Sequence, residues 1–128
     1  MAIKKLQHGF TNPEQSKMLL ELGVPADSAD CYRKSTMIIK GVIHYGKVEV
    51  IDDLIPIWNE FDNIPCWSVG RMIELLVTCA IDEDHVRSII ADIANYSAPV
   101  ETYVNVITYL CKIKELDFSK LEDKLIIK

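Results

Sequence analysis

Apolar side chains recur at helical spacing in the first part of the chain. A helix is expected to begin after Asn12, whose side chain can accept hydrogen bonds from free backbone N–H groups, with Pro13 at its first position. It is expected to end at Gly23, because glycine readily takes the left-handed conformation that closes a helix. The side chains that this spacing turns toward the core are Met18, Leu19 and Leu22.

Three further amphipathic helices are expected in the second half of the chain. Ser68 can cap the first, Asp82 begins the second, and Ser97 with Pro99 begins the third. The stretch from Thr102 to Thr108 is rich in β-branched residues, so it is also compatible with a strand. The apolar positions of these helices, followed by those of a last short helix, are Val69, Met72, Ile73, Leu76 and Ala80; Val86, Ile89, Ile90 and Ile93; Val100, Tyr103, Val104, Ile107, Leu110 and Cys111; and Phe118, Leu121 and Leu125.

Residues 35–51 change to β-branched and aromatic side chains, which predicts a β-hairpin. A two-residue turn is expected at Gly46 and Lys47, since a leading glycine suits a type II′ turn. Gly41 would then mark a bulge in the first strand. This register places Ile43, Tyr45, Val48 and Val50 on one face and His44 and Glu49 on the other.

Residues 52–65 are predicted to be irregular, because Pro56 and Pro65 disfavour both a continuous helix and a central strand. Aromatic side chains on irregular segments are common anchors of protein–protein interfaces, although they can equally fill or cover the core. The segment from Leu54 to Trp67 is therefore the candidate surface for a protein partner. Its candidate binding residues are Trp58, Phe61 and Trp67.

The order of these elements predicts an α+β fold. Helices are separated from the hairpin along the chain instead of alternating with strands, which favours a β-hairpin or small antiparallel sheet packed against about four to five helices. With 128 residues, the chain is expected to form a single globular domain over residues 1–128.

Charge and hydropathy restrict the partners. The formal net charge of -5 leaves no excess of Lys and Arg for a phosphate backbone, so nucleic acid is not an expected partner. The sequence contains no run of about 18 apolar residues, so no membrane span is predicted. The first residues also lack the apolar stretch of an export signal. Four dispersed cysteines suit a reducing compartment, and we expect a cytoplasmic protein.

Cys66 is the sharpest candidate for catalysis. It stands just before the expected helix at Ser68, and a helix N-terminus can lower the pKa of a thiol and make it nucleophilic. A cysteine-dependent hydrolase or transferase would also need a base such as His44 or His85. The alternative is that Cys66 belongs to a packed turn, as buried free cysteines commonly do.

No metal or cofactor is predicted. Cys79, His85, Asp82 and Asp84 could be assembled into a metal site, but the close cysteine pairs of structural zinc sites are missing. The acidic residues at this point are explained by their favourable position at a helix N-terminus. Glycine-rich phosphate loops and nucleophile elbows do not occur in the sequence.

Three segments resemble a group of small uncharacterised proteins encoded by Bacteroidetes chromosomes, prophages and mobile elements. They are residues 15–32 (QSKMLLELGVPADSADCY), residues 64–76 (IPCWSVGRMIELL) and the helix over residues 100–110. The group has no assigned activity, so the resemblance implies a source and no chemistry. Because catalytic motifs are missing and aromatic residues gather on the segment from Leu54 to Trp67, we expect a non-enzymatic protein-interaction module, with a small Cys66 hydrolase or transferase as the alternative and a homo-oligomer left open.

Overall fold

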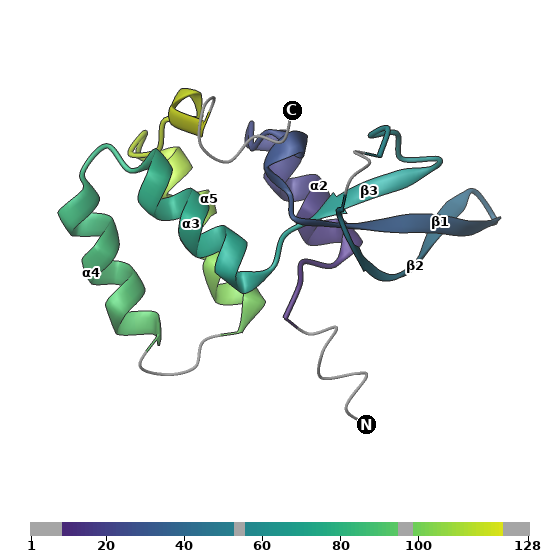
Figure 1. Ribbon diagram of the computed structural model, residues 1–128, viewed down its shortest axis with the longest axis horizontal. Helices are drawn as coiled ribbons and strands as arrows, with labels where there is room; N and C mark the ends of the chain where they lie inside the picture. The colour runs from purple at the N-terminus through teal and green to yellow at the C-terminus, as the bar shows by residue number, and fades with distance from the viewer. Residues whose placement is uncertain (1–8, 53–55, 95–98, 122–128) are drawn as a thin grey trace.

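The computed structural model describes residues 9–52, 56–94 and 99–121 (Figure 1). Within these ranges it has a three-stranded antiparallel sheet of order β2-β1-β3 and four α-helices, which confirms the predicted α+β class. In Figure 1 helices α3, α4 and α5 gather on one side, the sheet extends to the other, and α2 lies between them. The elements are α2 (Pro13–Glu21), η1 (Ala26–Ser28), β1 (Cys31–Ile39), β2 (Val42–Val50), β3 (Asn63–Cys66), α3 (Val69–Cys79), α4 (Glu83–Ala94), α5 (Val100–Lys112) and η2 (Phe118–Leu121).

The hairpin is present, but the predicted turn at Gly46 and Lys47 is wrong. The turn is formed by Lys40 and Gly41, whose φ angles are 51° and 79°, and Ile39 pairs with Val42 across it. A two-residue turn with positive φ at both central residues twists the chain in the sense that a hairpin needs. The first strand consequently begins at Cys31, earlier than expected.

Gly46 lies within β2 at a break in the strand register. Arg33 pairs with Val48 and Ser35 pairs with Tyr45, so β2 holds one residue more than β1 between these pairs. The extra residue forms a bulge at Gly46, whereas a bulge was predicted at Gly41. Of the four residues predicted to share a face, Ile43, Tyr45 and Val48 are partly buried, whereas Val50 is exposed.

The core lies mainly among the helices. Buried side chains of α3 and α5 pack around Trp67 and Leu19, and the stripe predicted for α5 is buried as a helix, which rules out a strand from Thr102 to Thr108. Met18 is wrong as a core residue, because the turn of the helix that buries Leu19 directs Met18 toward solvent. The core residues are Leu19, Val24, Ala29, Trp67, Met72, Leu75, Leu76, Cys79, Ala80, Val86, Val100, Tyr103, Val104, Ile107, Leu110 and Leu121.

The predicted irregular segment ends in a short strand. β3 contains Pro65, which pairs with Tyr32 at the edge of the sheet, where a missing N–H is tolerated. The last short helix is the 3-10 helix η2, whereas its expected member Leu125 lies outside the described residues, as does Leu54. None of the described helices combines the length and apolar character needed to cross a bilayer.

Candidate interaction surface

The end of the β1–β2 hairpin exposes four large apolar side chains, which we call the apolar hairpin end. This end extends away from the helices in Figure 1. Ile38 pairs with Ile43 while Ile39 pairs with Val42, and residues paired across strands share a face. Apolar side chains therefore occupy both faces of the hairpin. The four residues and their exposed fractions are Met37 55%, Ile38 58%, Ile39 47% and Val42 59%.

A turn beside the hairpin adds two more exposed apolar side chains, Ile57 at 78% and Phe61 at 59%. Ser35 of β1 holds this turn, since its N–H donates to the carbonyl oxygen of Asp62 at 2.9 Å and its hydroxyl donates to that of Phe61. The hydroxyl of Tyr45, on β2, donates to the carbonyl oxygen of Glu60 at 2.8 Å. These bonds join the turn to the hairpin, so both belong to one surface.

The two tryptophans differ from this pattern. Trp67 is fully buried, and its indole N–H donates to the hydroxyl of Ser28 at 3.1 Å. The side chain of Trp67 fills the core, so it is not part of the exposed surface. Trp58 is half-buried, and its indole N–H donates to a carboxylate oxygen of Asp27 at 2.8 Å. Of the three predicted binding residues, Phe61 is the exposed one.

A small hollow of about 150 Å³ lies beside Trp58, between α2 and the segment that leads into β3. Leu20 and Lys17 of α2 form one wall, and Trp58 and Pro65 contribute to the other. This volume suits a single side chain rather than a drug-sized ligand, for which about 300 Å³ or more is usual. It extends the surface around Ile57 and Phe61 by one shallow site.

Cys66 lacks the surroundings of a nucleophile. It is fully buried on β3 and pairs directly with Cys31 of β1. A hydrogen bond with Cys31 and burial both raise the pKa of the Cys66 thiol, the opposite of what an activated thiolate requires. The N-terminus of α3 does not offset this. Ser68 caps the helix and donates its hydroxyl to Asp30 at 2.6 Å, and the Asp30 carboxylate also raises the pKa of Cys66.

Neither described histidine meets Cys66. His44 pairs with Met37, which lies six positions along β1 from the Cys31 that faces Cys66, a distance of about 20 Å for extended chain. His85 lies on α4, where its Nδ1 is 2.9 Å from a carboxylate oxygen of Glu115. The structure thus does not assemble the predicted Cys66 hydrolase or transferase site.

Of the acidic residues weighed as metal ligands, Asp82 caps a helix and Asp84 lies in the first turn of α4. Asp82 accepts the backbone N–H of His85 at 3.1 Å at the start of α4, and Cys79 is buried in the core. Over residues 9–52, 56–94 and 99–121, no three His, Cys, Asp or Glu side chains are grouped so that they could hold a metal ion.

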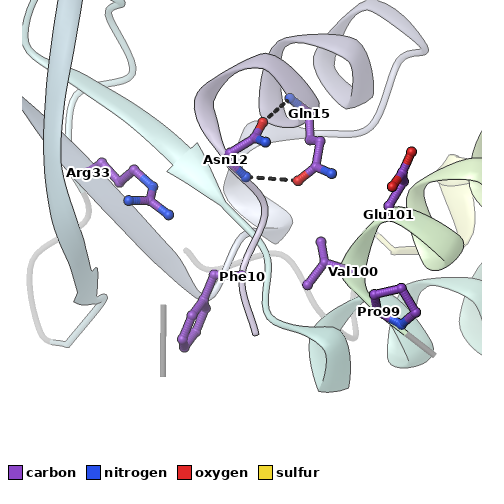
Figure 2. A pocket seen from close by; sticks show the side chains of 7 residues that line it. All are labelled: Phe10, Asn12, Gln15, Arg33, Pro99, Val100 and Glu101. Carbon is purple, nitrogen blue, oxygen red and sulfur yellow. Dashed lines mark hydrogen bonds between the residues drawn. The ribbon is translucent and has the colours of Figure 1, made fainter. Parts of the chain in front are cut away.

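Figure 2 shows another hollow, of about 380 Å³, between Arg33 of β1, the start of α2 and the start of α5. Three of its polar side chains, those of Asn12, Gln15 and Arg33, already bond to the backbone. Asn12 and Gln15 each accept the other's backbone N–H, at 2.8 and 3.0 Å. The guanidinium of Arg33 donates to the carbonyl oxygens of Gly46 and Thr11. We therefore assign no chemistry to this hollow.

The apolar hairpin end was not predicted, because the turn was expected at Gly46 and Lys47 and is formed by Lys40 and Gly41. With Gly46 as the turn, Met37 to Ile39 would have been an inner part of a longer strand. A signal was available, since three consecutive apolar residues leave no polar face on a strand that ends at a turn.

Comparison of the chain with protein-family models, with curated proteins and with solved structures gave no match.

Proposed function

We propose that this protein is a non-enzymatic interaction module that binds a protein partner through the apolar hairpin end together with Ile57 and Phe61. The observation that carries the proposal is the exposure of four large apolar side chains at the far end of one hairpin. The proposed surface differs from the expected segment from Leu54 to Trp67. Phe61 belongs to both, the hairpin is added, and Trp67 is left out.

Energetics favours a partner at this place. Covering the exposed half of an isoleucine or valine side chain stabilises a complex by roughly 1 kcal/mol, and here several such side chains lie together. Contiguous apolar patches are uncommon on monomeric proteins and commonly mark interaction sites. The adjoining aromatic ring of Phe61 is a residue type that interfaces favour.

The resemblance of residues 15–32, 64–76 and 100–110 and the free cysteines support a setting for this module. We propose a cytoplasmic protein of Bacteroidetes, encoded on a chromosome, prophage or mobile element. Reduced cysteines at Cys31, Cys66, Cys79 and Cys111 suit such a compartment.

Comparative affinity capture from Bacteroidetes cells tests the proposal. The tagged wild type is compared with Ile38→Ser/Phe61→Ser and with a matched control, Ile81→Ser/Tyr109→Ser, whose side chains are similarly exposed on the helical part. We expect one defined partner that the first variant loses by at least tenfold and the control retains. Equal recovery by both variants, or recovery of no specific protein, would contradict the proposal.

A further inference from the structure

Strand β2 forms one edge of the described sheet. In the order β2-β1-β3, no strand from residues 9–52, 56–94 or 99–121 pairs with the outer side of β2 over residues 42–50. An edge strand presents unpaired N–H and C=O groups that can hydrogen-bond to another extended chain. The edge is uneven, because the bulge at Gly46 interrupts it. A second irregularity separates Tyr45 from His44, so β2 pairs regularly with β1 over Val42–His44 and again over Val48–Val50.

A groove runs along the first part of this edge. It has a volume of about 490 Å³ and lies between β2 and the N-terminal half of α2. Its strand wall consists of the four consecutive residues 42–45. Its helix wall includes Pro13, Glu14 and Lys17. A groove between an edge strand and a helix has the shape that an added strand requires, with backbone partners on one side and side-chain contacts on the other.

The hairpin has the opposite charge to the rest of the molecule. Arg33, Lys34, Lys40 and Lys47 against Glu49 give residues 31–50 a net charge of +3, in a chain whose net charge is -5. On the helix wall of the groove Lys17 and Glu14 carry opposite charges, so the positive charge at this edge comes from the hairpin, where Lys40 and Lys47 stand on either side of residues 42–45. This pattern favours an acidic segment over a basic one, and it disfavours a second hairpin of the same charge.

We propose that an extended acidic segment of a protein partner adds to the sheet as a strand beside Val42–Tyr45, in the groove between β2 and α2. This inference rests on the proposed function and specifies its partner. Main-chain hydrogen bonds to β2 supply affinity, and the lysines of the hairpin, together with Lys17, select acidic side chains. The apolar hairpin end covers the apolar side chains of the added strand.

Nuclear magnetic resonance titration with a defined probe tests the proposal. The probe is the capped peptide acetyl-DVEVTVD-amide, compared with acetyl-KVKVTVK-amide and with the acidic peptide N-methylated at alternate residues. We expect the acidic peptide to bind with Kd at or below about 1 mM, with the largest amide shifts at residues 42–45. Both comparison peptides should bind at least tenfold more weakly.

Two charge variants provide the control. Lys17→Glu should weaken binding of the acidic peptide at least threefold, whereas Lys112→Glu, at an exposed position on α5, should not change it. No shifts at 1 mM peptide, shifts outside the groove, or equal binding by the two variants would overturn the proposal. Amide broadening at β2 that grows with protein concentration alone would assign the edge to a second copy and also overturn it.

The peptide titration and the capture experiment fail separately. Loss of the partner in Ile38→Ser/Phe61→Ser, together with no peptide binding, would reject strand addition and retain the interaction module. Binding of anionic phosphatidylserine vesicles by a protein that binds no peptide would reject strand addition in favour of a lipid surface.

Discussion

Trp67 and Phe61 show how differently two aromatic residues of one segment are used. Trp67 is fully buried, its indole bonds to Ser28, and its backbone N–H donates to the hydroxyl of Thr11 at 3.0 Å. The ring of Phe61 is exposed on a turn. Its backbone carbonyl oxygen accepts a hydrogen bond from the hydroxyl of Ser35. Composition alone predicts the same environment for both aromatic residues. Their burial differs because Phe61 lies in the turn before β3, whereas Trp67 follows β3 and packs in the core.

We predict that Trp67→Ala lowers the free energy of unfolding by about 3–5 kcal/mol, because it leaves a large cavity and unpaired polar groups in the core. Phe61→Ala should change it by less than about 0.5 kcal/mol, as expected for an exposed side chain. Urea denaturation of both variants and the wild type provides the comparison. Similar losses in the two variants would contradict the assigned burial of Trp67.

Buried thiols make stability depend on alkaline pH. Burial raises the pKa of Cys79 to about 12, above the value of about 8.5 for a free thiol. Between these values the unfolded chain releases a proton that the folded chain keeps, so the free energy of unfolding falls as the pH rises. We expect this loss to be smaller in Cys79→Ala than in the wild type when unfolding is measured from pH 8 to 11. Parallel pH profiles would argue against a buried, protonated Cys79.

The same reasoning predicts a slow Cys66. Its thiol should react with iodoacetamide at pH 7.5 at least tenfold more slowly than a model thiol, because it is buried and its pKa is raised. Mass spectrometry of tryptic peptides gives the rate at Cys66, and the urea-unfolded protein serves as the reference. A rate above that of the model thiol would reopen the hydrolase hypothesis.

At the scale of elements, the position of one turn decides what the hairpin displays. Lys40 and Gly41 both adopt positive φ, a conformation that glycine tolerates and lysine rarely takes. Gly46, in contrast, lies where an added Cβ would be 3.2 Å from the side chain of Thr36. Both glycines are compatible with a turn in sequence terms. The pairing of β1 with β2, in which Ile39 lies opposite Val42, places the turn at Lys40 and Gly41.

The turn assignment has a direct test. Gly41→Ala should destabilise the hairpin by about 1 kcal/mol, because a Cβ is strained at φ 79°. Lys40→Asn should stabilise it by several tenths of a kcal/mol, since Asn-Gly is a preferred pair for this turn. Hydrogen exchange of the amides in β1 and β2 measures both effects. Opposite signs would contradict a turn at residues 40 and 41.

Helix caps were predictable because they depend on neighbouring residues. Asn12 and Ser68 begin α2 and α3 as expected, and each accepts a backbone N–H three residues later. What the sequence could not indicate is the support of Ser68 by Asp30, from a distant segment. The sequence also could not indicate that Cys66 of β3 pairs with Cys31 of β1. In this position the Cys66 thiol is buried and is not the reactive group that its place before a helix suggested.

For the whole molecule, the α+β class and the helical core were predictable, whereas the exposed apolar surface was not. Repeated apolar spacing gives helices locally, as in α5 with its buried Tyr103 and Ile107. An exposed surface is what remains uncovered after every element has packed, so it needs the complete arrangement. The turn that carries Phe61 is joined to the hairpin by hydrogen bonds from Ser35 of β1 and Tyr45 of β2.

Site-specific photo-crosslinking in living cells of the native host tests the interaction surface most directly. A benzophenone amino acid is placed at Ile38, at Phe61 and, as a control, at the exposed Ser88 of α4. The account predicts an adduct of one defined mass from the first two positions and none from Ser88. Adducts of equal yield at all three positions, or none at Ile38 and Phe61, would contradict a partner-binding surface on the hairpin.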